Sequence, residues 1–327
     1  MQSAVWLQAR NDANNLARSP FNAGLIRGRK VWEATTGIYI MSMVANDDTI
    51  FLANHKPVEV GGRPAPVPQL SAVRRSDGRE IWSLPVPEWG AGYPVSLKMS
   101  ASGLLLVAAG DKARCTVCAY NVQERKRVWT KHLLSDGYRF TMNASPVGAV
   151  LVGIEREGAQ CIALEEQGGT MLWSATDSDC FRLFSADATG HVYYVDKRRR
   201  VVARDALNGK MLWSVVCNAS QKSAVCVDGT TLYVVDTSGT LRIIDGKSRK
   251  IVSSTLIKKD GILLGFGKSG LIYMTNKVLD AIGAYTTSGR CIWTAPNSLT
   301  AFLLGDDDFM LVGERAEPYG HRLALIN

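Results

Sequence analysis

Cys115 and Cys118 form a C-x-x-C pair in this 327-residue chain, a spacing that can hold a metal ion or a redox-active disulfide. A zinc site also needs a second such pair or nearby histidines, and the sequence offers neither at usable spacing. The pair falls in a segment expected to be a strand, where residues three apart point to opposite faces of the sheet. We therefore expect no metal or redox chemistry at this pair.

The other residue types that commonly carry chemistry give no pattern. The run Asp306–Asp308 lacks the alternating ligands and the glycine of a calcium loop. The four histidines are far apart in the sequence, and we expect a structural role for each. We predict no catalytic, cofactor-binding or metal-binding residue and no bound cofactor.

A basic run, Lys197, Arg198, Arg199 and Arg200, adds to a formal net charge of +8. Such a run can dock an acidic partner or a phosphate backbone, and the alternative is an ordinary solvated turn. Trp89, in the segment PEWGAGYP, is either an exposed contact residue or part of a packed loop.

A repeat organises the chain around these residues. The segment VARDALNGKMLW, 202–213, has Ala203 ten residues and Gly209 four residues before Trp213. Related segments recur along the chain. Their anchors are Trp32, Trp82, Trp129, Trp173, Trp213, Ser253 and Trp293, with spacings of 50, 47, 44, 40, 40 and 40 residues.

Between anchors the sequence predicts short strands, for example 222–227, 230–236, 240–245 and 251–256, separated by turn residues. A four-stranded unit of about 40 residues is typical of a β-propeller blade. The glycine permits the turn before the fourth strand, and we expect the tryptophan to fill the space between blades with its N–H near a backbone acceptor. The small residue ten positions back would make room for a neighbouring ring.

The two ends of the chain complement each other. Residues 321–327, HRLALIN, resemble a third strand without a fourth, and residues 29–34, RKVWEA, resemble a fourth strand without the first three. We therefore predict an all-β, seven-bladed β-propeller of four-stranded antiparallel blades, closed by an N-terminal strand that completes the C-terminal blade. Residues 1–22 would form an N-terminal arm and residues 23–327 the propeller.

The pattern A-x-D-x-x-[TN]-G-x-x-x-W resembles the docking motif of the PQQ-like (quinoprotein dehydrogenase-like) propeller repeats. Residues 203–213 match it in full, and 72–82, 163–173 and 283–293 match in part. The resemblance implies a relation to one of two groups in that family. One group comprises dehydrogenases that use pyrroloquinoline quinone and calcium, and the other comprises non-catalytic binding propellers that include an outer-membrane assembly lipoprotein. The chain lacks the adjacent Cys-Cys pair of the enzymes and the lipidated cysteine of the lipoprotein, so the resemblance carries over the fold and no functional residue.

We accordingly predict a non-enzymatic protein-interaction scaffold, a subunit of a larger assembly such as a virion. Partners would bind through the arm 1–22, with Trp6, and through the long loop 55–69. Further candidate contacts are Trp89, Lys197, Arg198, Arg199 and Arg200. The alternatives are a small-ligand binder or enzyme that uses the central channel, and nucleic-acid or acidic-partner binding through a basic face.

Location is predicted from the N-terminus and the cysteines. The first residues lack the apolar core of a secretory signal, and the seven cysteines are scattered. We expect a protein that is cytoplasmic or built into a larger particle, without membrane contact.

Overall fold

The computed structural model describes most of the chain from Lys30 onward. The described residues are 30–37, 39–46, 48–60, 63–86, 89, 95–110, 114–134, 140–154, 160–176, 185–220, 225–259, 261–266, 270–275, 281–296, 299–304, 310–316 and 320–326. The arm 1–22, with Trp6, and the run Asp306–Asp308 lie outside them.

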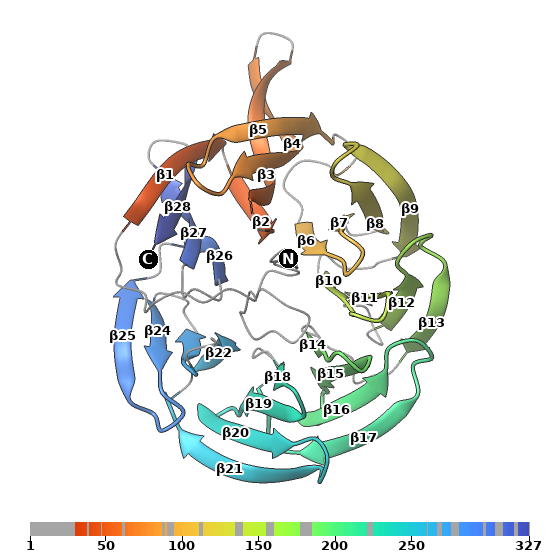
Figure 1. Cartoon of the computed structure of the whole chain (residues 1–327), viewed down its shortest axis with the longest axis vertical. Coiled ribbons are helices and arrows are strands. Elements are labelled where there is room, and N and C mark those ends of the chain that lie inside the picture. Colours follow the sequence, from red (N-terminus) through yellow and green to blue (C-terminus); the bar gives the residue numbers. More distant parts are fainter. Residues whose placement is uncertain are drawn as a thin grey trace.

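Six sheets, which we call the first to sixth blades, each consist of four consecutive antiparallel strands (Figure 1). The first blade contains β2 (Tyr39–Ala45), β3 (Thr49–Val60), β4 (Arg63–Arg74) and β5 (Glu80–Pro85). The second contains β6 (Val95–Met99), β7 (Leu104–Gly110), β8 (Arg114–Asn121) and β9 (Lys126–Leu134). The third contains β10 (Phe140–Ala144), β11 (Ala149–Ile154), β12 (Gln160–Glu165) and β13 (Met171–Thr176).

The remaining three blades follow the same order. The fourth contains β14 (Ser185–Ala186), β15 (His191–Val195), β16 (Arg200–Asp205) and β17 (Met211–Val216). The fifth contains β18 (Val225–Asp228), β19 (Thr231–Val235), β20 (Thr240–Asp245) and β21 (Lys250–Leu256). The sixth contains β22 (Ile262–Phe266), β23 (Ile272–Thr275), β24 (Ala281–Tyr285) and β25 (Cys291–Pro296).

A further four-stranded sheet, which we call the closing sheet, joins the two ends of the described chain. It contains β26 (Leu299–Leu304), β27 (Met310–Ala316), β28 (Gly320–Ile326) and β1 (Lys30–Gly37), with β1 outermost. Strand β1 runs antiparallel to β28 from the pair Lys30–Ile326 to the pair Gly37–His321. The N-terminal strand therefore supplies the fourth strand that the C-terminal segment lacks.

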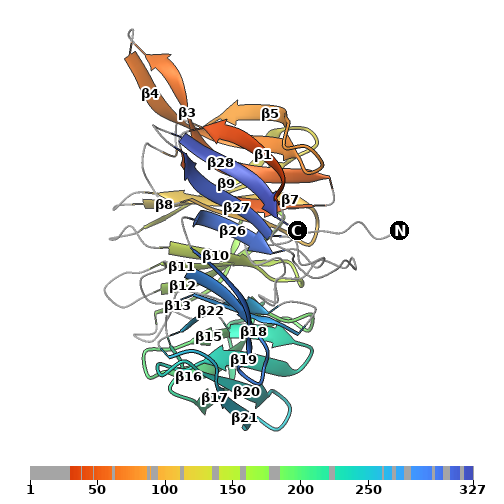
Figure 2. The ribbon, with the colours of Figure 1, turned by 90° about the vertical axis from the view of Figure 1, so that its left-hand side faces the viewer.

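The sheets are arranged around a ring, with the first strand of each near the centre and the fourth at the circumference (Figure 1). The view turned by 90° shows a flattened body (Figure 2). The predicted all-β propeller class with four-stranded antiparallel blades is confirmed. In the described part of the chain, no helix is long and apolar enough to cross a membrane.

The apolar core lies between neighbouring sheets, because alternate residues of a strand face opposite ways. Along β7, Leu105 and Val107 pack with the first blade, whereas Leu106 and Ala108 pack with the third. Both faces of a blade are thus covered, which explains near-continuous apolar runs such as AVLVGI in β11, where every residue is buried.

The segment 55–69 corrects an expectation, because it is a strand pair and not a loop. Strands β3 and β4 continue beyond the blade as a long hairpin, paired from Thr49–Arg74 to Val60–Arg63. The hairpin projects from the ring (Figure 1). The part of the hairpin beyond β5 has no third strand to pair with, so the prolines at 57, 64 and 66 need not remove a ladder bond.

Candidate functional site

The turn between the third and fourth strands of a blade is built by the repeat motif. In the fourth blade the Asp205 carboxylate accepts the backbone N–H groups of Leu207 and Asn208 at 2.9 and 3.0 Å. The Gly209 N–H donates to the Asp205 carbonyl at 2.9 Å, with φ +73° at the glycine. In the third blade Glu165 caps the N–H groups of Gln167 and Gly168 in the same way. The acidic residue therefore closes the turn, and the glycine supplies its left-handed residue.

Each of three tryptophans docks onto the corresponding turn of the next sheet. The indole N–H donates at 2.8 Å from Trp32 to the Arg75 carbonyl, from Trp129 to Glu166 and from Trp173 to Ala206. The rings also lie against the turn glycines. A Cβ built at Gly78, Gly169 or Gly209 would stand 2.7–2.8 Å from the incoming ring. The glycine is therefore required by the neighbouring tryptophan as well as by the turn.

The role proposed for the small residue ten positions back needs correction. Ala163 and Ala203 are the cross-strand register partners of Trp173 and Trp213 in their own sheets. The ring that arrives from the neighbouring sheet meets the turn glycine instead. In the sixth blade the partner of Trp293 is Ala284, and Gly283 faces Thr294, because this turn is one residue shorter.

A second hydrogen bond ties the two kinds of turn together. Glu166, whose carbonyl accepts the Trp129 indole, donates its own N–H to the Gly148 carbonyl at 3.0 Å. Ala206 donates likewise to Gly190 at 2.8 Å. These bonds hold the β10–β11 turn beside the β12–β13 turn, and the β14–β15 turn beside the β16–β17 turn.

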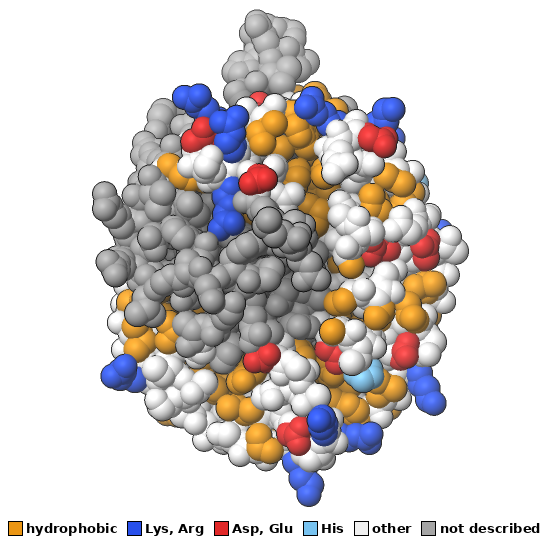
Figure 3. All heavy atoms as spheres, in the orientation of Figure 1, with side chains coloured by type: hydrophobic (Ala, Val, Ile, Leu, Met, Phe, Trp, Pro, Cys, Tyr) orange, Lys and Arg blue, Asp and Glu red, His pale blue; other side chains and the backbone are white. Residues whose placement is uncertain are grey.

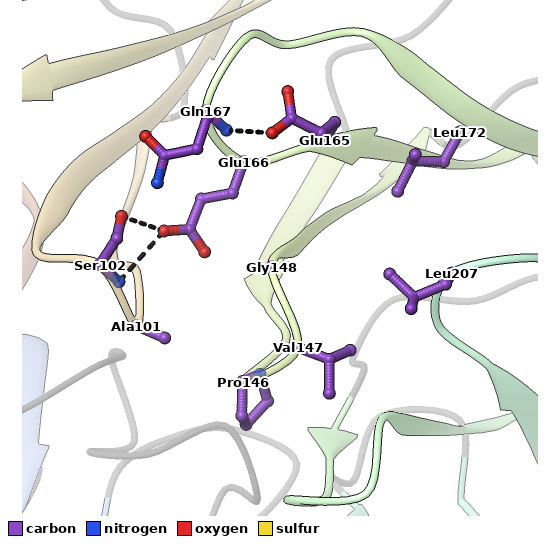
Figure 4. Close-up of a pocket in the computed structure, with 10 residues that line it drawn as sticks. All are labelled: Ala101, Ser102, Pro146, Val147, Gly148, Glu165, Glu166, Gln167, Leu172 and Leu207. Carbon is purple, nitrogen blue, oxygen red and sulfur yellow. Dashed lines mark hydrogen bonds between the residues drawn. The ribbon is translucent and has the colours of Figure 1, made fainter.

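A groove of about 490 Å³ lies among these turns of the second, third and fourth blades. We call it the inter-blade groove. Its lining residues are Ala101, Ser102, Pro146, Val147, Gly148, Glu165, Glu166, Gln167, Leu172 and Leu207 (Figure 4).

One side of the inter-blade groove is polar and already hydrogen-bonded. The side chain of Glu166, a residue only 3% exposed, points toward Ser102, which donates to it from its N–H at 3.1 Å and from its hydroxyl (Figure 4). Glu166 therefore fastens the second blade to the third. The carboxylates of Glu165 and Glu166 accept hydrogen bonds from groups of this chain, so the polar side of the groove is held in place before anything binds.

The other side of the inter-blade groove is apolar. Leu172 on β13 and Leu207 in the β16–β17 turn are 38% and 50% exposed, and Val147 lies near them (Figure 4). Exposed branched side chains beside a preformed polar wall can receive apolar side chains of a binding partner.

Exposed apolar residues also follow the outer strands in a regular way. A β-bulge recurs beside the anchor, for example between Ala163 and Leu164 opposite β13 and between Ile243 and Ile244 opposite β21. The residue immediately before the anchor has no register partner there, and in five described blades it is a large exposed aliphatic residue, whereas Leu212 of the fourth blade packs against the core. Exposed examples are Ile81, Val128, Leu172, Val252 and Ile292. On the face shown in Figure 3, hydrophobic side chains are exposed over several described blades, and most Lys and Arg side chains lie at the rim.

Of the predicted contact residues that the structure describes, none lines the inter-blade groove. The basic run occupies the β15–β16 turn, where Lys197, Arg198 and Arg199 are exposed and Arg199 has φ +60°. Arg200 is engaged, because its guanidinium pairs with the buried Asp196 carboxylate at 2.6 Å.

Trp89 is not the exposed contact that was considered. It is 3% exposed and packs in the core between the first and second blades, with Val86 and Leu97. Its ring fills the inter-blade space at a position outside the repeat, which explains why the motif gave no role for it.

The C-x-x-C pair has the geometry expected of a strand. Cys118 packs in the core between the first and second blades, and Cys115 in the core between the second and third. Burial, with a smaller effect of Cys118, raises the pKa of the Cys115 thiol to about 12. At neutral pH this thiol is therefore protonated and unreactive.

A polar cluster in the β14–β15 turn was not singled out from the sequence. The nearly buried Asp187 accepts hydrogen bonds from Thr189, from the His191 N–H and from the Tyr193 hydroxyl, the last at 2.8 Å. Burial opposes ionisation of Asp187, but these bonds outweigh it and hold its pKa below the usual value. The D-x-x-G-x spacing of this turn was the available signal.

The comparisons with known proteins agree with this geometry. The family model described as outer membrane protein assembly factor BamB matches residues 24–179 and 157–254, more than half of the chain. The chain belongs to this family of PQQ-like β-propellers. The resemblance seen in the sequence is thereby confirmed. No curated protein matches the chain significantly.

Two solved structures illustrate the fold of the family. BamB from Moraxella catarrhalis is 13% identical, with a TM-score of 0.62, over 91% of this chain and 97% of that one. A quinohemoprotein alcohol dehydrogenase, ADHIIG from Pseudomonas putida HK5, is 12% identical, with a TM-score of 0.62, over 95% of this chain and 69% of that one. At these identities the likeness concerns the fold, which serves binding proteins and enzymes alike.

Proposed function

We propose that the protein is a non-enzymatic interaction scaffold in a larger assembly, and that the inter-blade groove receives an apolar segment of a protein partner. The observation that carries the proposal is that exposed Leu172 and Leu207 stand beside a polar side of the groove, which the Glu166–Ser102 hydrogen bonds hold in place. Apolar contact on a rigid site gives affinity at a low entropic cost.

The family description supports the assembly part of the proposal. The matching family model is that of an assembly factor, and one similar solved structure is a BamB protein. The similarity to an alcohol dehydrogenase supports only the shared fold, so the enzyme alternative draws no residue of this chain from it. Neither comparison bears on a virion setting.

The experiment is site-specific photo-crosslinking in cells that express the full chain. A photoreactive residue placed at Leu172 or Leu207 should give the same discrete protein adduct. The matched control is Leu134, an exposed residue at the end of β9 that does not line the groove. The adduct should be lost in Leu207→Asp when the probe is at Leu172. Equal adducts from Leu134, or none from either groove position, would contradict the proposal.

The β3–β4 hairpin is a further attachment point in the proposal. The β3–β4 hairpin projects beyond the ring and so can reach a partner without disturbing the blades (Figure 1). The arm 1–22 with Trp6 and the basic turn at 197–200 stay predictions, as does the location in the cytoplasm or a larger particle.

We also propose that the closing sheet functions as a seventh blade, which makes the ring continuous. Pairing of β1 with β28 supports this, as does the docking of Trp32 from β1 onto Arg75 of the first blade. The closing sheet thus contacts the first blade in the same way as one blade contacts the next.

A further inference from the structure

The outer strand of the fifth blade, β21, differs from the other outer strands. Its anchor position is Ser253, so no indole fastens it to the next sheet. Six of its seven residues are exposed, among them Val252 at 60% and Leu256 at 62%. In β9, by comparison, Trp129 and Leu133 are buried.

The contact with the sixth blade explains this exposure. A Cβ at Gly289, in the β24–β25 turn, would stand 2.8 Å from the Leu256 carbonyl oxygen. Backbone thus lies against backbone where other junctions hold a tryptophan ring. The side chains of β21 are left uncovered as a consequence.

The free edge of β21 carries no charge beyond its first residue and no proline to hinder the pairing of a further strand. It is the outermost strand of its sheet, so half of its backbone N–H and C=O groups face away from β20. Strand β9 carries Lys131 within the strand, and β5 and β25 end in proline, whereas β13 and β17, like the interior of β21, carry neither. In β21 the one charge is Lys250, at its first residue.

Cations gather at both ends of β21. Exposed Lys247, Arg249 and Lys250 stand at its start, and Lys258, Lys259 and Arg290 follow its end or lie on the adjoining turn. The nearby acidic groups are engaged: Asp245 caps the N–H groups of Lys247 and Ser248, and Asp236 pairs with Arg242. Asp260, next in sequence, lies outside the described residues.

We propose that β21 is a docking edge for an extended acidic segment of a partner protein, which adds to the fifth blade as a fifth strand. The backbone of the segment would pair with β21, its apolar side chains would cover Val252 and Leu256, and acidic residues at its ends would meet the two groups of cations. A second copy of this chain fits less well, since antiparallel pairing of two β21 edges would bring cations against cations.

This site is separate from the inter-blade groove, which lies on the second to fourth blades (Figure 1). The test of β21 can therefore fail while the test of the inter-blade groove succeeds, and the reverse.

The test is fluorescence polarisation with a labelled synthetic peptide, Asp-Glu-Val-Thr-Val-Thr-Val-Asp-Glu, and the full-length protein. We expect saturable binding that weakens as salt rises. A peptide with lysines in place of the acidic residues should bind at least tenfold more weakly. N-methylation of alternate residues should abolish binding for one set and spare the other, because a strand pairs through alternate residues.

Matched variants locate the site. Lys250→Glu should weaken acidic-peptide binding about tenfold or more, and Val252→Asp should do the same without disturbing the core, because Val252 is exposed. The control is Lys126→Glu, since Lys126 follows Arg125 at the same repeat position in the second blade as Lys250 follows Arg249. It should leave binding unchanged.

Four results would overturn the proposal. Two concern the peptide: an equal loss of peptide affinity in Lys250→Glu and Lys126→Glu, or peptide binding that neither set of N-methyl groups weakens. The other two point to a different partner: a single-stranded DNA oligonucleotide that binds more tightly than the peptide, or a dimer of this protein that Lys250→Glu strengthens.

Discussion

At the residue scale, the turn glycines carry two separate constraints. Gly209 has φ +73° and would place a Cβ 2.7 Å from Cδ2 of Trp173, whereas Gly229 has φ +58° with no atom within 4 Å of its Cβ position. We expect Gly229→Ala to cost about 1 kcal/mol through the backbone alone and Gly209→Ala about 2–4 kcal/mol, because the clash adds to the strain.

Urea unfolding followed by circular dichroism measures both free energies of unfolding. Equal losses in the two variants would mean that the ring does not constrain the turn.

The second prediction at this scale concerns acid stability. Burial disfavours the charged form of Asp236, but bonds from the Ser238 hydroxyl, the Thr240 N–H and Arg242 outweigh it and lower its pKa below the reference value of 3.8. Because the pKa of Asp236 is lower in the folded state than in the unfolded state, the ionised carboxylate stabilises the fold above about pH 3.8. This contribution is lost as the pH falls through the folded-state pKa.

Asp236→Asn should therefore lower stability by about 1–3 kcal/mol at pH 7 and flatten its decline below pH 4. Free energies of unfolding between pH 2.5 and 7 test this, with the exposed Asp48→Asn as control. An unchanged acid slope in Asp236→Asn would contradict the assignment.

Residue-level reasoning from the sequence identified the turn glycine and the tryptophan correctly, because both act through local backbone geometry and size. It left open whether Trp89 is exposed or packed, since the burial of this residue depends on the junction of two blades. It also overlooked the aliphatic residue before the anchor, although the recurring triplets EIW, RVW, MLW and CIW carried the signal.

At the element scale, the outer strand β13 is held to the next blade by Trp173, which packs and hydrogen-bonds there. Trp173→Phe keeps a ring and removes the N–H donated to Ala206, so we expect a loss of about 1–2 kcal/mol. Trp173→Ala removes the packing too and should cost about 3–5 kcal/mol. Chemical denaturation measures both, and equal losses would show that the ring packing contributes nothing.

Element-level prediction succeeded for the strands of the fifth blade and failed for the segment 55–69. Four prolines and a Gly-Gly pair suggested a loop, because those residues usually end strands. A two-stranded hairpin outside the ring tolerates them. The inter-blade groove was also missed, since Ser102, Val147, Glu166 and Leu207 come from three blades and meet only after the blades stack.

At the scale of the whole molecule, the meeting of the chain ends is the feature that holds the ring. Ala34 on β1 faces Leu323 on β28, so a Cys pair at these positions should form a disulfide and raise the free energy of unfolding by about 2–4 kcal/mol. The control pair, Ala34→Cys with Val312→Cys, is two strands apart and should not bridge. Failure of the first pair, or bridging by the second, would contradict the closure.

The central claim is that the inter-blade groove is where a partner binds. Hydrogen–deuterium exchange of the full-length protein, alone and with the partner found by crosslinking, tests it most directly. We predict slower exchange on binding in residues 165–172 and 205–208, the two segments that carry the lining residues Glu166, Leu172 and Leu207. Protection confined to the β3–β4 hairpin or to the turn at 196–200, with the groove unchanged, would contradict it.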